Sequence, residues 1–268
     1  MPEFEVTGPI TAVIRSSAGQ VTLLAEDRTA VEVTVRPGAS GDAARAAAAE
    51  TRVEMDGDLL LVETPQARGF IVRRTPPVEI TVRLPVDSRA EVHTASADVK
   101  CTGRLGAAEI KTASGDVRVD EVAGDLTRNS ASGDTQFATV GGDLAATSAS
   151  GDVRGGYVAG NVTSRSASGD TTIEIVGGSL KAQSASGDIK IGSITAGTAR
   201  VSTASGDVEL GVAQGTSVWL DLSSVSGATV SDLNVTDAAP AGGSASLNLH
   251  VRTASGDISV RRAVASAR

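Results

Sequence analysis

The sequence predicts an all-β protein built as a parallel β-solenoid with about 18 residues per coil, which we expect to be right-handed. Three observations predict this fold. The tetrapeptide Ala-Ser-Gly-Asp occurs seven times, runs rich in Val, Ile, Thr and Ser separate the copies, and aromatic residues make up only 2% of the chain. Because a narrow, close-packed coil leaves little room for rings, this composition indicates a thin interior.

The repeats define the period of the coil. The seven motifs begin at Ala113, Ala131, Ala149, Ala167, Ala185, Ala204 and Ala254. The first five are 18 residues apart, and a second turn, such as the one ending at Asp143, falls halfway between copies. Weaker copies begin at Ala95 and Ser224. A fixed period of this kind is typical of solenoids, so we expect two short strands and two turns per coil.

Alignment of the chain by 18 residues produces apolar columns separated by polar ones. One apolar column is Leu126, Leu144, Val162 and Leu180; a second is Val119, Phe137, Gly155, Ile173 and Ile191; a third is Val122, Val140, Val158, Val176 and Ile194. A polar column between them is Arg118, Gln136, Arg154, Thr172 and Lys190. This alternation predicts strands with one buried face.

The glycines of the motif are predicted to be structural turn residues. They are Gly115, Gly133, Gly151, Gly169, Gly187, Gly206 and Gly256. Glycine permits a positive φ, which tight turns often require.

The aspartates that follow these glycines should stack in one column. They are Asp116, Asp134, Asp152, Asp170, Asp188 and Asp207. In water, like charges at the spacing of neighbouring strands repel by about 1 kcal/mol per pair, so something must offset the repulsion. We expect each carboxylate to accept hydrogen bonds from backbone N–H groups or serine hydroxyls of its own turn. The alternative is a row of Ca²⁺ ions, although the turns lack the Gly-x-Gly-x-Asp order of calcium-binding nonapeptide repeats.

The two ends of the chain are less regular than the middle. Residues 1–90 are predicted to form an irregular β segment that starts or caps the solenoid, with one short helix near residues 41–53 that Ser40 or Asp42 would cap. Residues 91–260 form the predicted solenoid domain, in which residues 231–244 are a loop before one further strand pair, and residues 261–268 are a basic tail.

The sequence does not indicate an enzyme, a catalytic residue or a cofactor. A serine nucleophile needs a nearby base, and the chain has only two histidines, His93 and His250, which are far apart in the repeat stack. The formal net charge of −8 argues against nucleic acid as a partner. No apolar run is long enough to insert into a membrane as a helix.

One basic segment with an aromatic residue is a candidate patch for a partner protein. It contains Arg68, Phe70, Arg73 and Arg74. The first residues of the chain lack the features of a signal peptide, so we expect a cytoplasmic protein, with non-classical export to the cell surface as the alternative.

The tandem Ser-Gly-Asp-Val repeats are preceded by an irregular segment, Phe4–Val21, and by the strand-like Val78–Pro85. Together these features resemble the bacterial β-strand-repeat proteins labelled putative adhesins, which are common in actinobacteria. The resemblance covers nearly the whole chain. It implies a β-solenoid, and it implies neither an activity nor a set of site residues, because the function of that family is unknown.

These observations favour a non-enzymatic structural or interaction module, a rigid acidic scaffold that presents a surface to a protein partner. One alternative is an exported or surface adhesin for which calcium is a candidate ligand. A second alternative is a cytoskeletal element that self-associates end to end through poorly capped coils, as bactofilins do.

Overall fold

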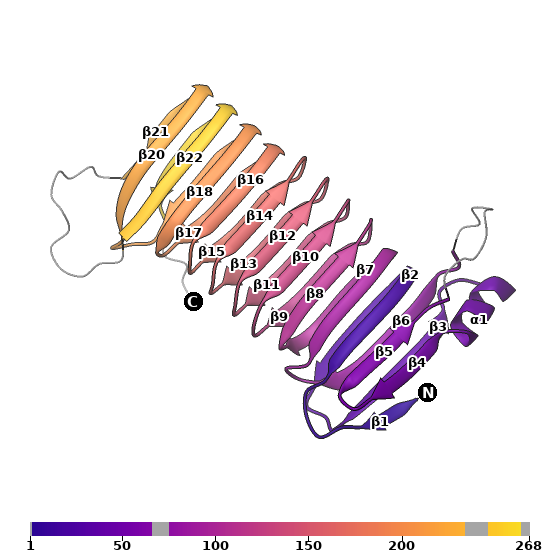
Figure 1. The fold of residues 1–268 in the computed structure, drawn as a ribbon. Helices are drawn as coiled ribbons and strands as arrows, with labels where there is room; N and C mark the ends of the chain where they lie inside the picture. The colour runs from indigo at the N-terminus through magenta and orange to yellow at the C-terminus, as the bar shows by residue number, and fades with distance from the viewer. Residues whose placement is uncertain (1, 66–74, 234–245, 264–268) are drawn as a thin grey trace. The chain divides into compact units, whose positions relative to one another are not determined.

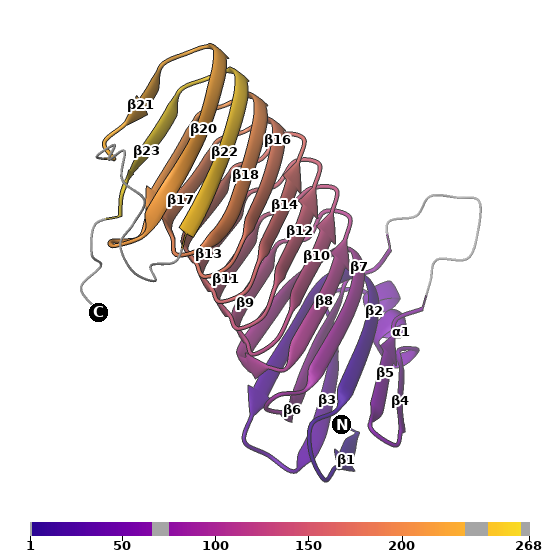
Figure 2. The ribbon, with the colours of Figure 1, turned by 60° about the vertical axis from the view of Figure 1, so that its left-hand side comes forward.

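The computed structural model describes residues 2–65, 75–233 and 246–263. The chain divides into two compact units, Met1–Ala138 and Thr139–Arg268, which we call unit 1 and unit 2. Parallel β-strands dominate both units, and unit 1 also contains a helix (Figures 1 and 2). The fold is therefore the parallel β-solenoid that the repeats predict.

Unit 1 contains one short helix and the first strands of the chain. The helix is α1 (Asp42–Ala49). The strands are β1 (Glu3–Glu5), β2 (Thr11–Glu26), β3 (Ala30–Pro37), β4 (Arg52–Asp56), β5 (Leu59–Glu63), β6 (Val78–Pro85), β7 (Arg89–Leu105), β8 (Ala107–Thr112), β9 (Val117–Val122) and β10 (Leu126–Ser130). Strand β11 (Thr135–Val140) contains the boundary between the units.

The coils of unit 1 stack through parallel pairing. The first half of β2 pairs with β5 and its second half pairs with β6, while its other edge pairs with β7 along most of its length. Gln20 of β2 lies beside Asp98 of β7. The segment Ser16–Leu23 therefore occupies the place of a degenerate repeat beside the weak copy that begins at Ala95.

Antiparallel strands cover the outer edge of the coil that β5 and β6 form. Strand β3 pairs with β6 and β4 pairs with β5, both antiparallel, and β1 pairs with the other edge of β3. Helix α1 packs against β3 and β6, with Ala44 and Ala47 buried. A reversal of chain direction thus closes the hydrogen-bonding edge of the first coil, as sheet edges require if they are not to remain open.

The helix appears where the sequence predicts it, but its predicted cap is wrong. The N-cap is Gly41, with a φ of 131°, and it makes no side-chain capping hydrogen bond. Glycine is tolerated at this position because it adopts such a φ without a steric cost, and the chain thereby turns into the helix without help from Ser40 or Asp42.

Unit 2 consists of regular two-strand coils. Its strands are β12 (Leu144–Ser148), β13 (Val153–Val158), β14 (Val162–Ser166), β15 (Thr171–Val176), β16 (Leu180–Ser186), β17 (Ile189–Ile194), β18 (Gly197–Ser205), β19 (Val208–Val212), β20 (Ser217–Ser226), β21 (Thr229–Ser231), β22 (Ser246–Ser255) and β23 (Ile258–Arg262). In successive coils the strands pair parallel and in register, so that Val162 lies beside Leu180 and Ile173 beside Ile191.

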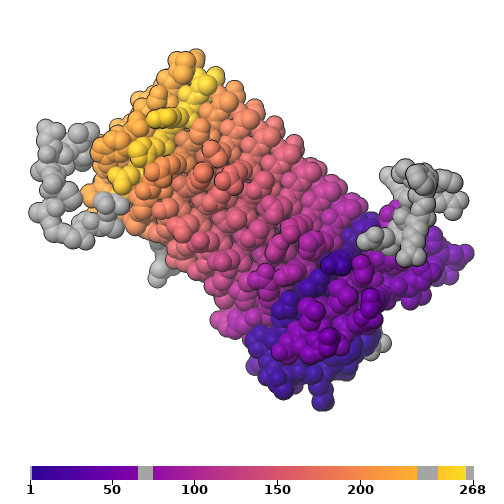
Figure 3. All heavy atoms as spheres, viewed as in Figure 1, coloured from indigo at the N-terminus to yellow at the C-terminus, as the bar shows by residue number. Residues whose placement is uncertain are grey.

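The spatial order of the last coils differs from their order in the sequence. Strand β22 pairs with β18 on one edge and with β20 on the other, and β23 pairs with both β19 and β21. Figures 1 and 3 show the yellow strand β22 between the two orange strands β18 and β20. The coil that comes last in the sequence therefore lies inside the stack. The preceding coil, β20–β21, which we call the terminal coil, is the outermost described coil of unit 2.

The interior is thin and apolar, as the aligned columns predict. Leu144, Val162 and Leu180 are each at most 1% exposed, and Val158, Val176 and Ile194 are fully buried. Small residues such as Ala146 of β12 and Ala182 of β16 share the interior with the larger Ile173 and Ile191. The predicted boundaries at residues 90 and 260 stay predictions. Among the described residues, no helix is long and apolar enough to cross a membrane.

Candidate functional site

The column of aspartates is a hydrogen-bonded ladder. In unit 1 the carboxylate of Asp98 accepts the backbone N–H of Asp116, and Asp116 accepts that of Asp134, with N···O distances of 3.0 and 2.9 Å. In unit 2 the same bond joins Asp152 to Asp170, and the ladder continues to the terminal coil. Its later steps run from Asp170 to Asp188, Asp188 to Asp207, Asp207 to Asp257 and Asp257 to Ala228.

Each carboxylate therefore caps a neighbouring coil, whereas the sequence predicted a bond within its own turn. Within a turn, a hydroxyl side chain can accept a backbone N–H instead. Gly115 N–H, for example, donates to Thr112 Oγ1 at 2.9 Å. A hydrogen bond to a charged group contributes about 1.5–3 kcal/mol, which exceeds the repulsion of about 1 kcal/mol between exposed neighbouring carboxylates. The ladder thus explains the aspartates without a bound cation.

A second ladder runs along the alternate turns. Asp143 Oδ1 accepts the backbone N–H of Asn161 at 2.7 Å, Asn161 Oδ1 accepts that of Ser179 at 3.0 Å, and Ser179 Oγ accepts that of Thr198 at 3.2 Å. An amide or a hydroxyl oxygen accepts this bond as a carboxylate does. The loss of charge along this column in the sequence therefore has a simple cause: the position requires an oxygen acceptor and not an anion.

The motif glycines are required mainly by the close approach of the neighbouring coil. Of the seven, Gly133 and Gly256 have a positive φ, at 106° and 149°, and the others described do not. A Cβ on Gly187 would overlap the carbonyl oxygen of Gly169 one coil earlier, and one on Gly169 would overlap that of Gly151. Few of these turns therefore use the positive φ that glycine permits, and the close carbonyl groups of the neighbouring coil are what exclude a side chain there.

The described residues show no arrangement that indicates catalysis or a metal. No group of three or more His, Cys, Asp or Glu side chains in this part of the chain could hold a metal ion. His93 belongs to unit 1 and His250 to unit 2, and His250 Nδ1 lies 3.3 Å from Asp221 Oδ2. The predicted patch of Arg68, Phe70, Arg73 and Arg74 lies outside the described residues.

Two buried ionisable side chains belong to the interior of unit 1. Burial raises the pKa of the Cys101 thiol to about 12, with a smaller contribution from Asp120. Arg128 is fully buried within its coil, its guanidinium donates to the carbonyl oxygen of Gly133, and burial lowers its pKa. Arg128 is not among the residues predicted above. The sequence does contain a signal for it, because the residues 18 positions before and after it, Ile110 and Ala146, are both apolar.

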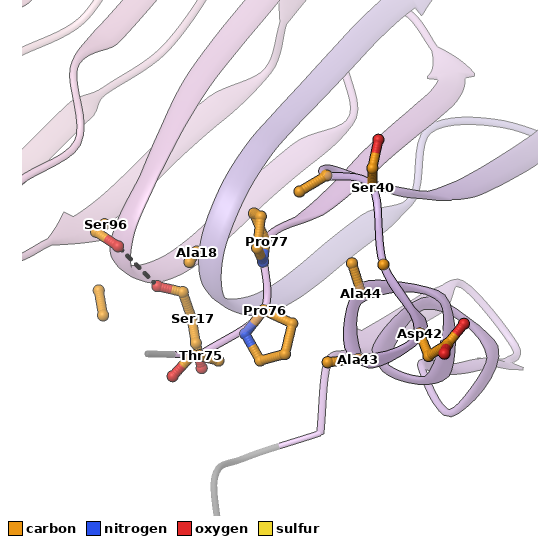
Figure 4. A pocket seen from close by; sticks show the side chains of 13 residues that line it. Ser17, Ala18, Ser40, Asp42, Ala43, Ala44, Thr75, Pro76, Pro77 and Ser96 are labelled. Atoms are coloured by element: carbon orange, nitrogen blue, oxygen red, sulfur yellow. Dashed lines mark hydrogen bonds between the residues drawn. The ribbon is translucent and has the colours of Figure 1, made fainter. Parts of the chain in front are cut away.

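A concavity of about 640 Å³ in unit 1 lies between α1 and the bend of β2 (Figure 4). It is lined by Ser17, Ala18, Ala39, Ser40, Gly41, Asp42, Ala43, Ala44, Thr75, Pro76, Pro77, Ala95 and Ser96. Ser96 donates a hydrogen bond to the carbonyl oxygen of Ser17 at 3.3 Å. Asp42 is the one ionisable residue of this lining, and its side chain is fully exposed. The lining can therefore accommodate small neutral or apolar groups, but it brings no acid and base together.

The terminal coil is the most open part of the described chain. Trp219 is 54% exposed, Val225 86% and Val230 59%. Leu220 and Leu222, which stand in the core-facing register beside Leu249 and Val251, are only half-buried, whereas those two neighbours are fully buried. No described strand pairs with the outer edge of β20 or β21. This coil therefore offers apolar side chains and free backbone groups together.

Comparisons with solved structures find similar proteins at low sequence identity. A protein from Parabacteroides distasonis described as a putative lipid binding protein is 12% identical, with 97% of this chain and 95% of that chain covered and a TM-score of 0.47. A putative adhesin from Bacteroides fragilis is 13% identical over the same shares, with a TM-score of 0.42. A second putative adhesin, from Parabacteroides distasonis, is 12% identical, with 96% and 95% covered and a TM-score of 0.40.

A search of curated proteins finds no match to this chain. A family model does match, and it covers residues 13–261, which include every parallel coil described above. The chain therefore belongs to the Toastrack DUF4097 family.

Proposed function

We propose that this protein is a non-enzymatic interaction module that binds a protein partner at its terminal coil. The proposal rests on the outer edge and the exposed apolar side chains of β20 and β21. Their outer edge is unpaired among the described strands, and Leu220 and Leu222 remain half-exposed beside the exposed Val225. An extended segment of a partner that added a strand here would satisfy the backbone groups and cover the leucines.

The remainder of the solenoid would act as a rigid support for this surface. The in-register pairing and the aspartate ladder tie each coil to its neighbours, so the terminal coil is held in place by β22 and β23. A preformed edge reduces the entropy that a partner loses on binding, since only the partner's segment has to become ordered. A cytoplasmic location is part of this proposal, and cell fractionation tests it against a surface location.

Site-specific crosslinking tests the proposal directly. A photo-crosslinking amino acid would replace Val225 or Val230, and in control variants it would replace Gln136 or Thr172, which lie on outward faces of other strands. We expect crosslinks to a distinct protein in cells that naturally make this chain, from the terminal-coil positions and not from the controls. Equal crosslinking from all four positions, or none from the terminal coil, would contradict the proposal.

Self-association is the second candidate, and the same open edge favours it. A crosslink between two copies, together with a mass by light scattering that rises with concentration, would identify a self-assembling element. The double variant Val225→Lys/Val230→Lys should abolish such assembly, whereas Gln136→Lys/Thr172→Lys should not, because charged lysines on an edge prevent strand pairing.

The calcium-dependent adhesin remains a third candidate that thermal unfolding tests. Because a backbone N–H already occupies one oxygen of each described ladder carboxylate, we expect the same unfolding midpoint in EDTA and in millimolar Ca²⁺. A large rise of the midpoint with Ca²⁺ would replace the scaffold proposal with that of a calcium-bound adhesin.

A further inference from the structure

A hollow on one face of unit 2 brings basic side chains from three neighbouring strands together. Lys181 of β16, Arg200 of β18 and His250 of β22 lie side by side in one row of outward residues. Gln183, Ser202 and Arg252 lie side by side in the next row of the same strands. These six side chains, with Val201, line a hollow of about 310 Å³.

The hollow exists because a short side chain stands among long ones. Ser202 lies between Gln183 and Arg252 in its row, and Arg200 precedes it by two residues on the same face of β18. Outward residues of neighbouring strands are close enough to share a ligand. Ser202 therefore lies in the hollow between Gln183 and Arg252 and next to Arg200.

The positive charge of this hollow is poorly matched by acidic groups. The acidic side chain beside it is Asp221, which lies 3.3 Å from His250 Nδ1 and 4.0 Å from a guanidinium nitrogen of Arg252. Lys181 and Arg200 are exposed and form no ion pair or hydrogen bond with a side chain of the described residues. An anion that entered the hollow would therefore not have to displace an existing partner of either residue.

Several outward cations elsewhere in the described residues pair with an acidic side chain. On the opposite strands of unit 2, Glu209 pairs with Lys190 at 3.0 Å and with Arg261 at 3.2 Å. A hollow of unit 1 with a similar set of basic groups contains Lys111, which pairs with Glu109 at 2.6 Å. An unbalanced basic cluster in a chain with a net charge of −8 therefore needs a specific explanation.

We propose that this hollow is a binding site for a phosphate group. Arginine presents a planar set of N–H donors that match phosphate oxygens, lysine adds a point charge, and the Ser202 hydroxyl adds a donor at the floor. Lys181, Arg200 and Arg252 together match a dianion, whereas a single carboxylate would leave most of this charge unbalanced. The proposal is independent of the protein partner proposed for the terminal coil, because it rests on other side chains.

The single tryptophan of the chain provides a built-in probe of this site. The Trp219 ring lies 5.0 Å from the His250 ring, and His250 lines the hollow. Titration with inorganic phosphate at constant ionic strength, followed by Trp219 fluorescence and by the ³¹P NMR linewidth, should give a saturable curve. A linear or absent response in both measurements would overturn the proposal.

Two charge-matched variants separate a site from a general charge effect. Arg200→Gln/Arg252→Gln removes two cations from the hollow, and Lys190→Gln/Arg261→Gln removes two from the opposite strands of the same unit. We expect the first variant to weaken phosphate binding by at least about tenfold and the second to change it by less than about twofold. Equal weakening in both would overturn the proposal. All four positions are exposed or half-exposed, and circular dichroism would confirm that both variants fold.

The source of the phosphate is decided by two further measurements. Binding of glycerol phosphate would identify a soluble phosphate ester as the ligand class. Sedimentation with vesicles that contain phosphatidic acid, but not with phosphatidylcholine alone, would identify a lipid headgroup, provided that Arg200→Gln/Arg252→Gln abolishes it. Failure of both ligands and of inorganic phosphate would exclude the site, and it would leave the crosslinks expected at Val225 unaffected.

Discussion

The first coil of unit 1 and the terminal coil of unit 2 each have a sheet edge with no further described parallel coil beside it, and they differ in whether other strands cover that edge. In unit 1, β3 and β4 run antiparallel along β6 and β5, and Leu60, Val62, Ile80 and Val82 are at most 1% exposed. In unit 2 no described strand pairs with the outer edge of β20 or β21, and Leu220 and Leu222 remain half-exposed. A parallel stack ends in an open edge unless the chain reverses direction to cover it.

The difference supports the proposal that the terminal coil is the interaction surface. The covered edge of unit 1 also carries ion pairs in which Arg28 and Arg83 share Glu26 and Glu32 at 3.7–3.9 Å, an arrangement that keeps further strands away. The terminal coil has exposed valines and a tryptophan instead. Strands of this chain cover the edge of the first coil, whereas no described strand covers the edge of the terminal coil.

The largest expected effect comes from a carboxylate introduced at each end. Val33→Asp places a charge in the fully buried side of β3, so we expect the free energy of unfolding to fall by more than about 3 kcal/mol. Val230→Asp, at a residue that is 59% exposed, should change it by less than about 0.5 kcal/mol. Urea unfolding followed by circular dichroism measures both. Similar losses in the two variants would mean that Val230 is buried in solution, and this would contradict the open edge of the terminal coil.

A methyl group added to a turn glycine should have an intermediate effect that depends on the coil. Gly187→Ala would force the new Cβ onto the Gly169 carbonyl, and we expect a loss of about 2–3 kcal/mol. Gly227→Ala creates a similar overlap with the Gly256 carbonyl, and its φ of 153° adds backbone strain, so an outward shift of the terminal coil can relieve only part of its loss. Gly8→Ala is the control, because no atom lies within 4 Å of its added Cβ. A loss in Gly187→Ala as small as that in Gly8→Ala would contradict the close approach of neighbouring coils.

Removal of a ladder carboxylate should cost about 1–2 kcal/mol inside the stack. Asp188→Ala leaves the N–H of Asp207 without its acceptor, whereas Asp257→Ala releases only the N–H of Ala228 in the terminal coil. Hydrogen exchange should therefore accelerate across several coils in the first variant and mainly in β21 in the second. Asp188→Asn should remain within about 0.5 kcal/mol of the wild type, as the natural Asn161 suggests. A large loss in Asp188→Asn would show that the charge itself is required.

The smallest expected effect is a pH dependence that reports on unit 1 alone. The pKa of Cys101 is raised from 9.0 to about 12, so the folded state keeps a proton that the unfolded state loses above pH 9. Stability should be unaffected below about pH 8 and fall by about 1.4 kcal/mol between pH 8 and pH 10. Cys101→Ala should flatten this dependence, and an equal slope in both proteins would contradict the burial of the thiol.

Much of the fold follows from the repeats. The period determines the parallel register, because a stack in which equal columns coincide buries Leu180 on Val162 and Ile191 on Ile173. The helix was also predictable, since an alanine-rich run is a strong local signal. Its cap at Gly41 was not, because Ser40 and Asp42 are equally good candidates when the path of the chain is unknown.

The candidate sites were only partly accessible from the sequence. The Asp column was predicted, but its hydrogen bonds were assigned to the wrong turn, because one-dimensional spacing cannot distinguish a cap within a coil from a cap on the next one. The phosphate hollow was not predicted at all. Lys181, Arg200 and Arg252 are 19 and 52 residues apart in succession, and only the placement of β22 beside β18 brings them together.

The sequence by itself determined the coil, its period, its buried columns and its oxygen acceptors, because each of these depends on contacts that recur at a constant spacing. Only the tertiary structure decided the order of the last coils. Ala228 stands where the other copies of the motif have an aspartate. Its N–H is the last that the described ladder binds, and no described coil lies beyond it to donate to a carboxylate at this position. A full copy of the motif, with Asp257, lies inside because it must bind neighbours on both sides.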